Sequence, residues 1–173
     1  MRIVGDPRGH RARFDGEVVR PCLLATVLSG YAPGVSALEP VLYDLPPRII
    51  GIDGREGVGK TSFGRYLAWH FNVTLIETDL FANDGSVLLG YRLDELNRLI
   101  QLRLDRPRPV IIEGVALIRL LEHLRRRADF LLYCEALDYD PDESLASWLD
   151  EYAREYAPKA RANLVIQLDW RGI

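Results

Sequence analysis

The chain has 173 residues, of which 48% are hydrophobic and 27% are charged, and its formal net charge at neutral pH is −3. This is the size and composition of one globular domain with a hydrophobic core, and the weak negative charge argues against nucleic acid or an anionic membrane as a partner. No hydrophobic run approaches the roughly 20 residues that span a bilayer, and the first residues lack the apolar core of a signal peptide. Cys22 and Cys134 are the only cysteines and lack metal-ligand spacing, so we expect a cytoplasmic protein with reduced thiols.

Residues 1–47 are predicted to form an N-terminal extension that packs on the core. The pair Asp15-Gly16 lies between short apolar segments, as is typical of a small hairpin. Residues 21–28 could form a short helix with Pro21 in its first turn, and several later prolines indicate a connector. We expect this extension to pack where a closing helix after the last strand would otherwise lie, and one arrangement adds antiparallel strands to the edge of the sheet.

Residues 48–173 form the second predicted unit, and this unit begins with a strand, a glycine-rich loop and a helix. The apolar run at 49–52 predicts a buried strand, and Phe63 and Leu67 lie on one face of the helix predicted after the loop. The loop between them matches G-x-x-x-x-G-K-[ST] at every fixed position. Its residues, which with Ser62 are the predicted nucleotide-binding residues, are Gly54, Arg55, Glu56, Gly57, Val58, Gly59, Lys60 and Thr61.

The chemistry of such a loop explains its residue types. Glycines allow consecutive backbone N–H groups to point inward at an anion, and the N-terminus of the following helix adds a partial positive charge. Lys60 would reach the β- and γ-phosphates of a nucleoside triphosphate, and the Thr61 hydroxyl would hold Mg²⁺. The sequence therefore predicts binding of ATP and Mg²⁺.

Strands and helices alternate through the rest of the chain. Four further apolar runs predict strands at residues 73–76, 110–112, 130–133 and 164–166. Apolar residues at helical spacing predict intervening helices over residues 93–104, 117–124 and 145–156. Five strands that are mostly separated by helices predict a three-layer α/β fold, with a parallel sheet covered by helices on both faces.

Two acids follow two of these strands directly, Asp79 after the second and Glu113 at the end of the third. In an α/β fold, the loops that carry chemistry lie at the carboxyl ends of the strands. Phosphoryl transfer needs a carboxylate that accepts the proton of the acceptor hydroxyl, and Mg²⁺ needs a further oxygen ligand. Either acid could instead be a helix cap or a solvated loop residue, and that alternative stays open.

Three stretches in this order resemble the uridine-kinase-like branch of the P-loop kinases: residues 49–61, residues 77–81 and residues 110–115. The resemblance covers residues 48–168 and implies a sheet ordered 2-3-1-4-5. It also implies phosphoryl transfer from Mg-ATP to a small, nucleoside-like hydroxyl acceptor.

The same resemblance assigns roles to individual residues. In the Asp-x-Phe pair, Asp79 would be the catalytic base, and Phe81 would lie in the substrate site. Glu113 would belong to both the metal site and the substrate site.

One segment departs from the family pattern. The family carries an arginine-rich lid between its fourth and fifth strands, whereas here residues 135–156 are strongly acidic and contain a single arginine, Arg154. Arg154 is therefore the candidate lid arginine, and a helix-surface residue is the alternative interpretation. Arg55, in the loop, and Arg92, at the entry to the next helix, are candidate substitutes, and Arg92 is also a candidate substrate contact.

Two functions fit these observations. The first is an enzyme, a P-loop kinase with an atypical lid that acts on a small molecule. The second is a nucleotide-binding switch or weak ATPase that acts through a protein partner. The oligomeric state stays open, with a homodimer as one alternative.

Overall fold

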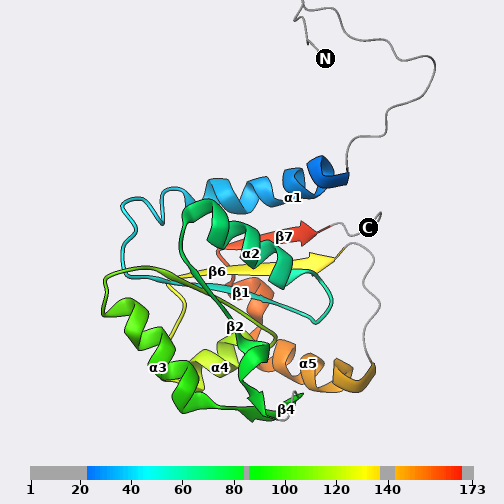
Figure 1. Ribbon diagram of the computed structural model, residues 1–173. Coiled ribbons are helices and arrows are strands. Elements are labelled where there is room, and N and C mark those ends of the chain that lie inside the picture. Colours follow the sequence, from blue (N-terminus) through cyan, green and yellow to red (C-terminus); the bar gives the residue numbers. More distant parts are fainter. Residues whose placement is uncertain (1–22, 84–85, 137–142, 169–173) are drawn as a thin grey trace, which may run out of the picture.

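A computed structural model of the chain describes residues 23–83, 86–136 and 143–168. Its centre is a parallel five-stranded sheet with the order β2-β5-β1-β6-β7 (Figure 1). The strands are β1 (Ile49–Gly54), β2 (Thr74–Glu77), β5 (Val110–Glu113), β6 (Phe130–Ala136) and β7 (Leu164–Leu168). Numbered along the chain, these five strands have the order 2-3-1-4-5, so the predicted sheet is confirmed.

Helices cover both faces of this sheet, which confirms the predicted three layers. On one face, α1 and α2 enclose a core with the side chains of Ile50 and Ile52, whereas Ile49 points into the core on the opposite face. That opposite face is covered by α3, α4 and α5. The helices are α1 (Leu23–Leu38), α2 (Lys60–Phe71), α3 (Leu93–Leu104), α4 (Leu117–His123), α5 (Glu143–Tyr156) and the short α6 (Pro158–Arg161). None of the described helices has the length and hydrophobicity needed to cross a membrane.

The helix α1 is longer than the sequence predicts. A short helix over 21–28 followed by a connector was expected, but α1 continues through Pro33 and Gly34. Tertiary packing accounts for the difference, because α1 lies against β7 and α2. A Cβ atom at Gly34 would lie 2.4 Å from the ring of Phe63, so glycine lets the helix approach α2 closely. Packing of this kind overrides the weak local preferences on which the sequence prediction depends.

The expected hairpin around Asp15-Gly16 lies outside the described residues. In the part of the extension that the structure describes, residues 23–47, the chain forms α1 and turns and contributes no strand to the sheet.

A small antiparallel hairpin between β2 and α3 was not predicted. The sequence analysis places no strand there, whereas the structure has β3 (Ala82–Asn83) paired with β4 (Ser86–Tyr91) after a 3₁₀ turn, η1 (Thr78–Phe81). The sequence of β4 lacks alternation of polar and apolar residues, and it contains Gly90 at a φ of 84°. The period-2 signal that identifies strands is therefore missing from this segment.

Candidate active site

The glycine-rich loop joins β1 to α2 in the strand–loop–helix arrangement that phosphate binding requires. Gly54, Gly57 and Gly59 all have positive φ angles, which glycine adopts readily. A Cβ atom at Gly54 would lie 2.4 Å from the carbonyl oxygen of Cys134, so no other residue fits there without a shift. The first turn of α2 has no side-chain cap, and its N–H groups remain available to an anion.

A hollow of about 280 Å³ lies over this loop, and the end of β5 and the turn after β2 also contribute to it. It brings Lys60 and Thr61 of the loop together with the two acids that the sequence analysis selected, Asp79 and Glu113. The complete lining is Glu56, Gly57, Gly59, Lys60, Thr61, Ser62, Asp79, Glu113 and Val115.

Lys60 is the cation of this hollow. Its side chain is buried, and its Nζ donates a hydrogen bond to the backbone oxygen of Arg55 at 2.6 Å, across the loop. Burial lowers the pKa of the Lys60 ammonium, and the negative charges of Glu113 and Asp53 oppose that shift. The carboxylates of Glu113 and Asp53 thus favour the charged form of Lys60 inside the loop.

Thr61 and Glu113 form a pair of oxygen donors. The Thr61 hydroxyl donates to Glu113 Oε1 at 2.9 Å, and Glu113 is only 1% exposed. Burial raises the pKa of Glu113, whereas the hydrogen bond from Thr61 and the charge of Lys60 lower it. Mg²⁺ prefers hard oxygen ligands and is commonly held by one or two protein carboxylates or hydroxyls, with phosphate oxygens and water in its remaining positions. The chemistry of this pair fits Mg²⁺, and the described residues contain no larger cluster of acids, histidines or cysteines that could hold a metal ion.

The turn η1 explains the spacing of the Asp-x-Phe pair. Asp79 is exposed and lines the hollow, whereas Phe81, two residues later, packs against the core formed by α3 and α4. Between β2 and Asp79, Thr78 is fully buried. The phenylalanine and the threonine thus anchor the turn, and the carboxylate between them is directed to the site.

Gly114 makes room for that anchor. A Cβ atom at this position would lie 1.9 Å from Thr78 Oγ1 and 3.1 Å from Thr78 Cβ. We therefore expect Gly114→Ala to lower the free energy of unfolding by about 1–3 kcal/mol, the usual effect of overpacking a core. Urea unfolding measures the change. Gly30→Ala in α1 is the control, because nothing lies within 4 Å of the added methyl group, and no loss of stability is expected. Equal free energies of unfolding for Gly114→Ala and the wild type would show that the turn moves to accommodate the methyl group without a loss of stability.

Arg92 lies outside the lining of the hollow and has a local role. Its guanidinium donates to the backbone oxygens of Leu80 and Ala82 at 2.6 and 3.1 Å and lies over the ring of Phe81. It therefore ties η1 and β3 to the start of α3.

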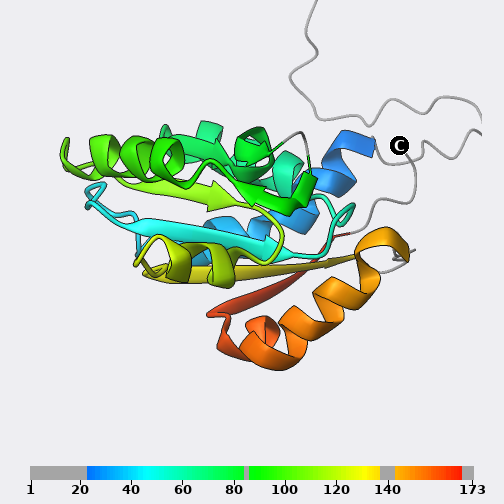
Figure 2. The ribbon, with the colours of Figure 1, turned by 90° about the horizontal axis from the view of Figure 1, so that it is seen from below.

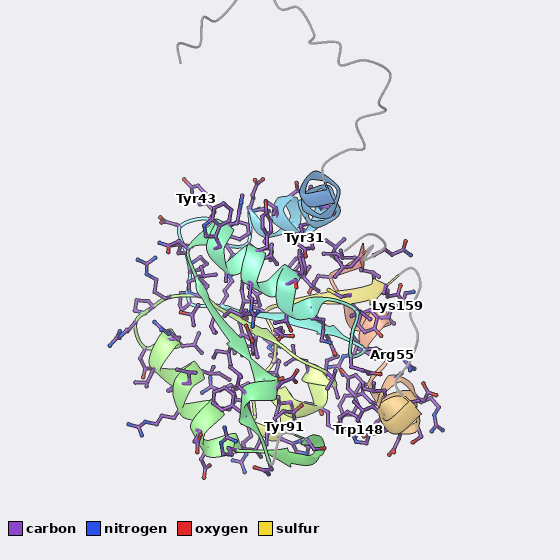
Figure 3. All side chains as sticks on the ribbon, turned by 45° about the vertical axis from the view of Figure 1, so that its right-hand side comes forward. Tyr31, Tyr43, Arg55, Tyr91, Trp148 and Lys159 are labelled. Atoms are coloured by element: carbon purple, nitrogen blue, oxygen red, sulfur yellow. The ribbon has the colours of Figure 1, made fainter. Side chains whose placement is uncertain are left out.

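Arg154 also lies outside the hollow. It is exposed on α5, and its Nε contacts the backbone oxygen of Asp150 at 3.4 Å. Arg55 leaves the loop in the direction of α5 and pairs with the Asp150 carboxylate (Figure 3).

A second hollow, of about 300 Å³, lies on the other side of β1. The first hollow is bounded by residues that follow β2 and β5, whereas this one is bounded by β6 and β7, which are on the opposite side of β1 in the sheet. Its lining is Arg55, Val58, Tyr133, Cys134, Glu135, Ala136 and Gln167. The phosphate loop therefore separates two hollows.

Asp53 and Tyr152 were missed by the sequence analysis. Asp53 is the last residue before Gly54 and is fully buried, and its Oδ1 accepts a hydrogen bond from the Gly54 N–H at 2.7 Å. Its Oδ2 accepts a hydrogen bond from the hydroxyl of Tyr152, on α5. Burial raises the pKa of Asp53, and these hydrogen bonds oppose the shift. An aspartate inside an apolar strand was the available signal, because such a residue needs buried donors.

Comparisons with known proteins agree with the fold. No protein-family model matches this sequence, and no curated protein matches it. A possible uridine kinase from Bacillus stearothermophilus is similar in structure, with a TM-score of 0.56 and 16% sequence identity over 82% of this chain and 99% of that chain.

Two further kinases match at lower TM-scores. A gluconokinase from Sinorhizobium meliloti 1021 has a TM-score of 0.44 and 17% identity over 73% of this chain and 85% of that chain. A shikimate kinase from Bacteroides thetaiotaomicron has a TM-score of 0.40 and 18% identity over 70% of this chain and 86% of that chain. Together with the sheet order and the geometry of the glycine-rich loop, the match to the possible uridine kinase shows that this chain has the α/β fold of the P-loop kinases.

Proposed function

We propose that this protein transfers the γ-phosphoryl group of ATP to a hydroxyl group of a small, nucleoside-like acceptor. One observation carries the proposal: the hollow over the phosphate loop contains both an exposed carboxylate, Asp79, and the donor pair Thr61–Glu113 beside Lys60. A phosphate-binding loop alone needs no second carboxylate at its mouth. A loop that serves transfer to a hydroxyl needs one to accept the proton.

Each residue has a separate task in this reaction. Lys60 and the loop N–H groups would bind the phosphates, and Thr61 and Glu113 would hold Mg²⁺, which would supply positive charge to stabilise the charge that develops during transfer. Asp79 accepts the proton of the acceptor hydroxyl. At the same time, the oxygen of that hydroxyl bonds to the γ-phosphorus, and the bond between the γ-phosphorus and ADP breaks. The hollow beside Asp79 is the acceptor side, and the hollow across β1 is available to the nucleoside of ATP.

A nucleotide-binding switch or weak ATPase remains the second candidate, because Arg154 does not line the phosphate site. An arginine near the γ-phosphate can raise the rate of phosphoryl transfer by several orders of magnitude. Within the described residues, Lys60 is the only basic residue that lines this hollow. A protein of this kind would bind ATP and hydrolyse it slowly, and a partner would detect the bound state.

The rate of ADP formation across a panel of nucleosides, sugars and sugar acids separates the two functions. For the kinase, we expect at least one acceptor to raise the rate by about 10²-fold or more over the rate in water alone, because Asp79 then acts as a general base. A slow rate that no acceptor changes would contradict the kinase and support the switch. The phosphorylated acceptor, identified by mass spectrometry, excludes stimulated hydrolysis.

A further inference from the structure

We propose that α5 positions the phosphate loop through Tyr152, which holds the carboxylate of Asp53 and thereby the first amide of the loop. This inference rests on the proposed function only for its effect on ATP. The positioning itself is a property of the protein without nucleotide. Tyr152 is thus a positioning residue that acts through Asp53.

Asp53 connects the end of β1 to the loop. It is fully buried, and one of its carboxylate oxygens accepts the Gly54 N–H at 2.7 Å. Gly54 has a φ of 148°, a conformation that side chains rarely adopt, and glycine by itself is the most flexible residue. The direction of the chain at the entry to the loop therefore depends on the hydrogen bond to Asp53.

Tyr152 fixes the other oxygen of that carboxylate. Its hydroxyl donates to Asp53 Oδ2 and accepts a hydrogen bond from the Ile118 N–H at 3.2 Å, so the group is satisfied on both sides. The tyrosine is 3% exposed and belongs to the core between the sheet, α4 and α5.

Further contacts fix the aromatic ring of Tyr152 in place. It stacks on Tyr156 with 5.2 Å between ring centroids, and the Arg119 guanidinium lies over both rings, at 5.8 and 5.5 Å. Arg119 is itself held by Glu155 at 2.8 Å. The hydroxyl thus projects from a fixed ring, which makes it a rigid support for Asp53.

A second contact joins α5 to the loop on the other flank of Gly54. Arg55 pairs with Asp150, which precedes Tyr152 by two residues on α5. This pair is partly exposed, and such pairs contribute little to stability by themselves. Its place beside the first contact means that α5 holds the residue before Gly54 and the residue after it. Figure 2 shows α5 starting near the carboxyl end of β6 and running back along the sheet.

Loss of the Tyr152 hydroxyl would leave a buried carboxylate short of a donor. A buried charge without its hydrogen bonds is costly, so the Asp53 side chain must turn toward another donor or take up a proton. Both responses weaken the hydrogen bond from Gly54. The loop amides would then be less well ordered before ATP binds. The free-energy cost of ordering them on binding would reduce the affinity for ATP.

Hydrogen exchange of the nucleotide-free protein tests the positioning directly. In Tyr152→Phe, we expect the amides of residues 54–59 to exchange about 10-fold faster, as the loss of a hydrogen bond to a charged group implies. Amides of β5, on the far side of β1, should exchange at the wild-type rate. Tyr156→Phe is the matched control, because it keeps the ring that stacks on Tyr152 and removes a hydroxyl that interacts with Arg119 rather than with Asp53.

Calorimetric titration with Mg-ATP measures the consequence. We expect Tyr152→Phe to weaken ATP binding by about 10-fold and Tyr156→Phe to change it by less than about twofold. Asp53→Asn is the second variant, and it keeps an oxygen for Gly54 but loses the charged partner of Tyr152. Faster loop exchange in Asp53→Asn supports the proposal even if Tyr152→Phe fails to fold.

Two results would overturn the inference. One is wild-type exchange of the loop in Tyr152→Phe and Asp53→Asn, and the other is an equal increase of exchange in the loop and in β5, which would indicate a general structural role. Failure of the wild type to bind ATP would instead contradict the proposed function, since the exchange experiment contains no nucleotide.

Discussion

Replacing Asp79 with asparagine is expected to reduce the turnover number for phosphoryl transfer by about 10²–10⁴-fold, the usual contribution of a general base. Asparagine has nearly the same shape but does not accept the proton of the acceptor hydroxyl. The affinity for Mg-ATP should remain close to that of the wild type, because the proposed function assigns phosphate binding to Lys60 and the loop. Initial rates at saturating ATP and acceptor, together with calorimetric titration of Mg-ATP, measure the two quantities.

Because Asp79 is exposed, its substitution should change the turnover number without changing the stability of the protein. The turn that carries it is anchored by Thr78 and Phe81, so the substitution should leave the free energy of unfolding unchanged. Asp94→Asn is the matched control, an exposed aspartate in the first turn of α3 that does not line the hollow, and it should leave the turnover number unchanged. If Asp79→Asn keeps full turnover, Asp79 is not the base. If it loses ATP affinity and not turnover, Asp79 serves the metal and the nucleotide.

The glycine-rich loop could be predicted from the sequence, because its residue types and the hydrophobic runs on both sides of it indicate the same structure. Glycines, Lys60 and Thr61 are required by the phosphate loop at fixed spacing, and the hydrophobic runs before and after them specify the strand and helix that the loop needs. The strand order 2-3-1-4-5 came from the family resemblance, because hydrophobic periodicity identifies strands but does not say which of them are neighbours.

The contact between Asp53 and Tyr152 could not be predicted in this way. The two residues are separated by 99 positions, and the pattern of α5 identifies Tyr152 only as a core residue. An apolar stripe shows which side chains are buried, but not that one hydroxyl within the stripe meets a carboxylate in the central strand. Such a contact is a property of the packed tertiary structure.

The position of Arg154, by contrast, could have been derived from helix geometry. The stripe that includes Leu149 and Tyr152 faces the sheet, and both side chains are buried. Successive helical residues are rotated by about 100°, so a residue two positions after Tyr152 lies about 200° away and faces solvent. A helix over residues 143–156 therefore directs Arg154 away from the core, as the structure shows.

Lys60→Ala is expected to weaken Mg-ATP binding by about 10–100-fold, which corresponds to the loss of one charge-assisted hydrogen bond to phosphate. The effect on turnover should be at least as large, because in the proposed reaction the ammonium would face the phosphoryl group whose charge is redistributed during transfer. Lys60 is also the partner of the Arg55 carbonyl, so the variant loses a contact that spans the loop. Titration calorimetry with Mg-ATP gives the affinity, and circular dichroism confirms that the variant is folded.

An exposed basic residue away from both hollows provides the control. Arg98, on α3, is exposed and lines neither hollow, so Arg98→Ala removes the same charge without a change in ATP affinity beyond about twofold. Both proposed functions require the phosphates to lie in the loop beside Lys60. A Lys60→Ala variant that is folded and binds Mg-ATP as tightly as the wild type would therefore contradict both the kinase and the switch. If Lys60→Ala instead loses much of its affinity for Mg-ATP while Asp79→Asn keeps the wild-type affinity, the two residues serve separate steps of one reaction.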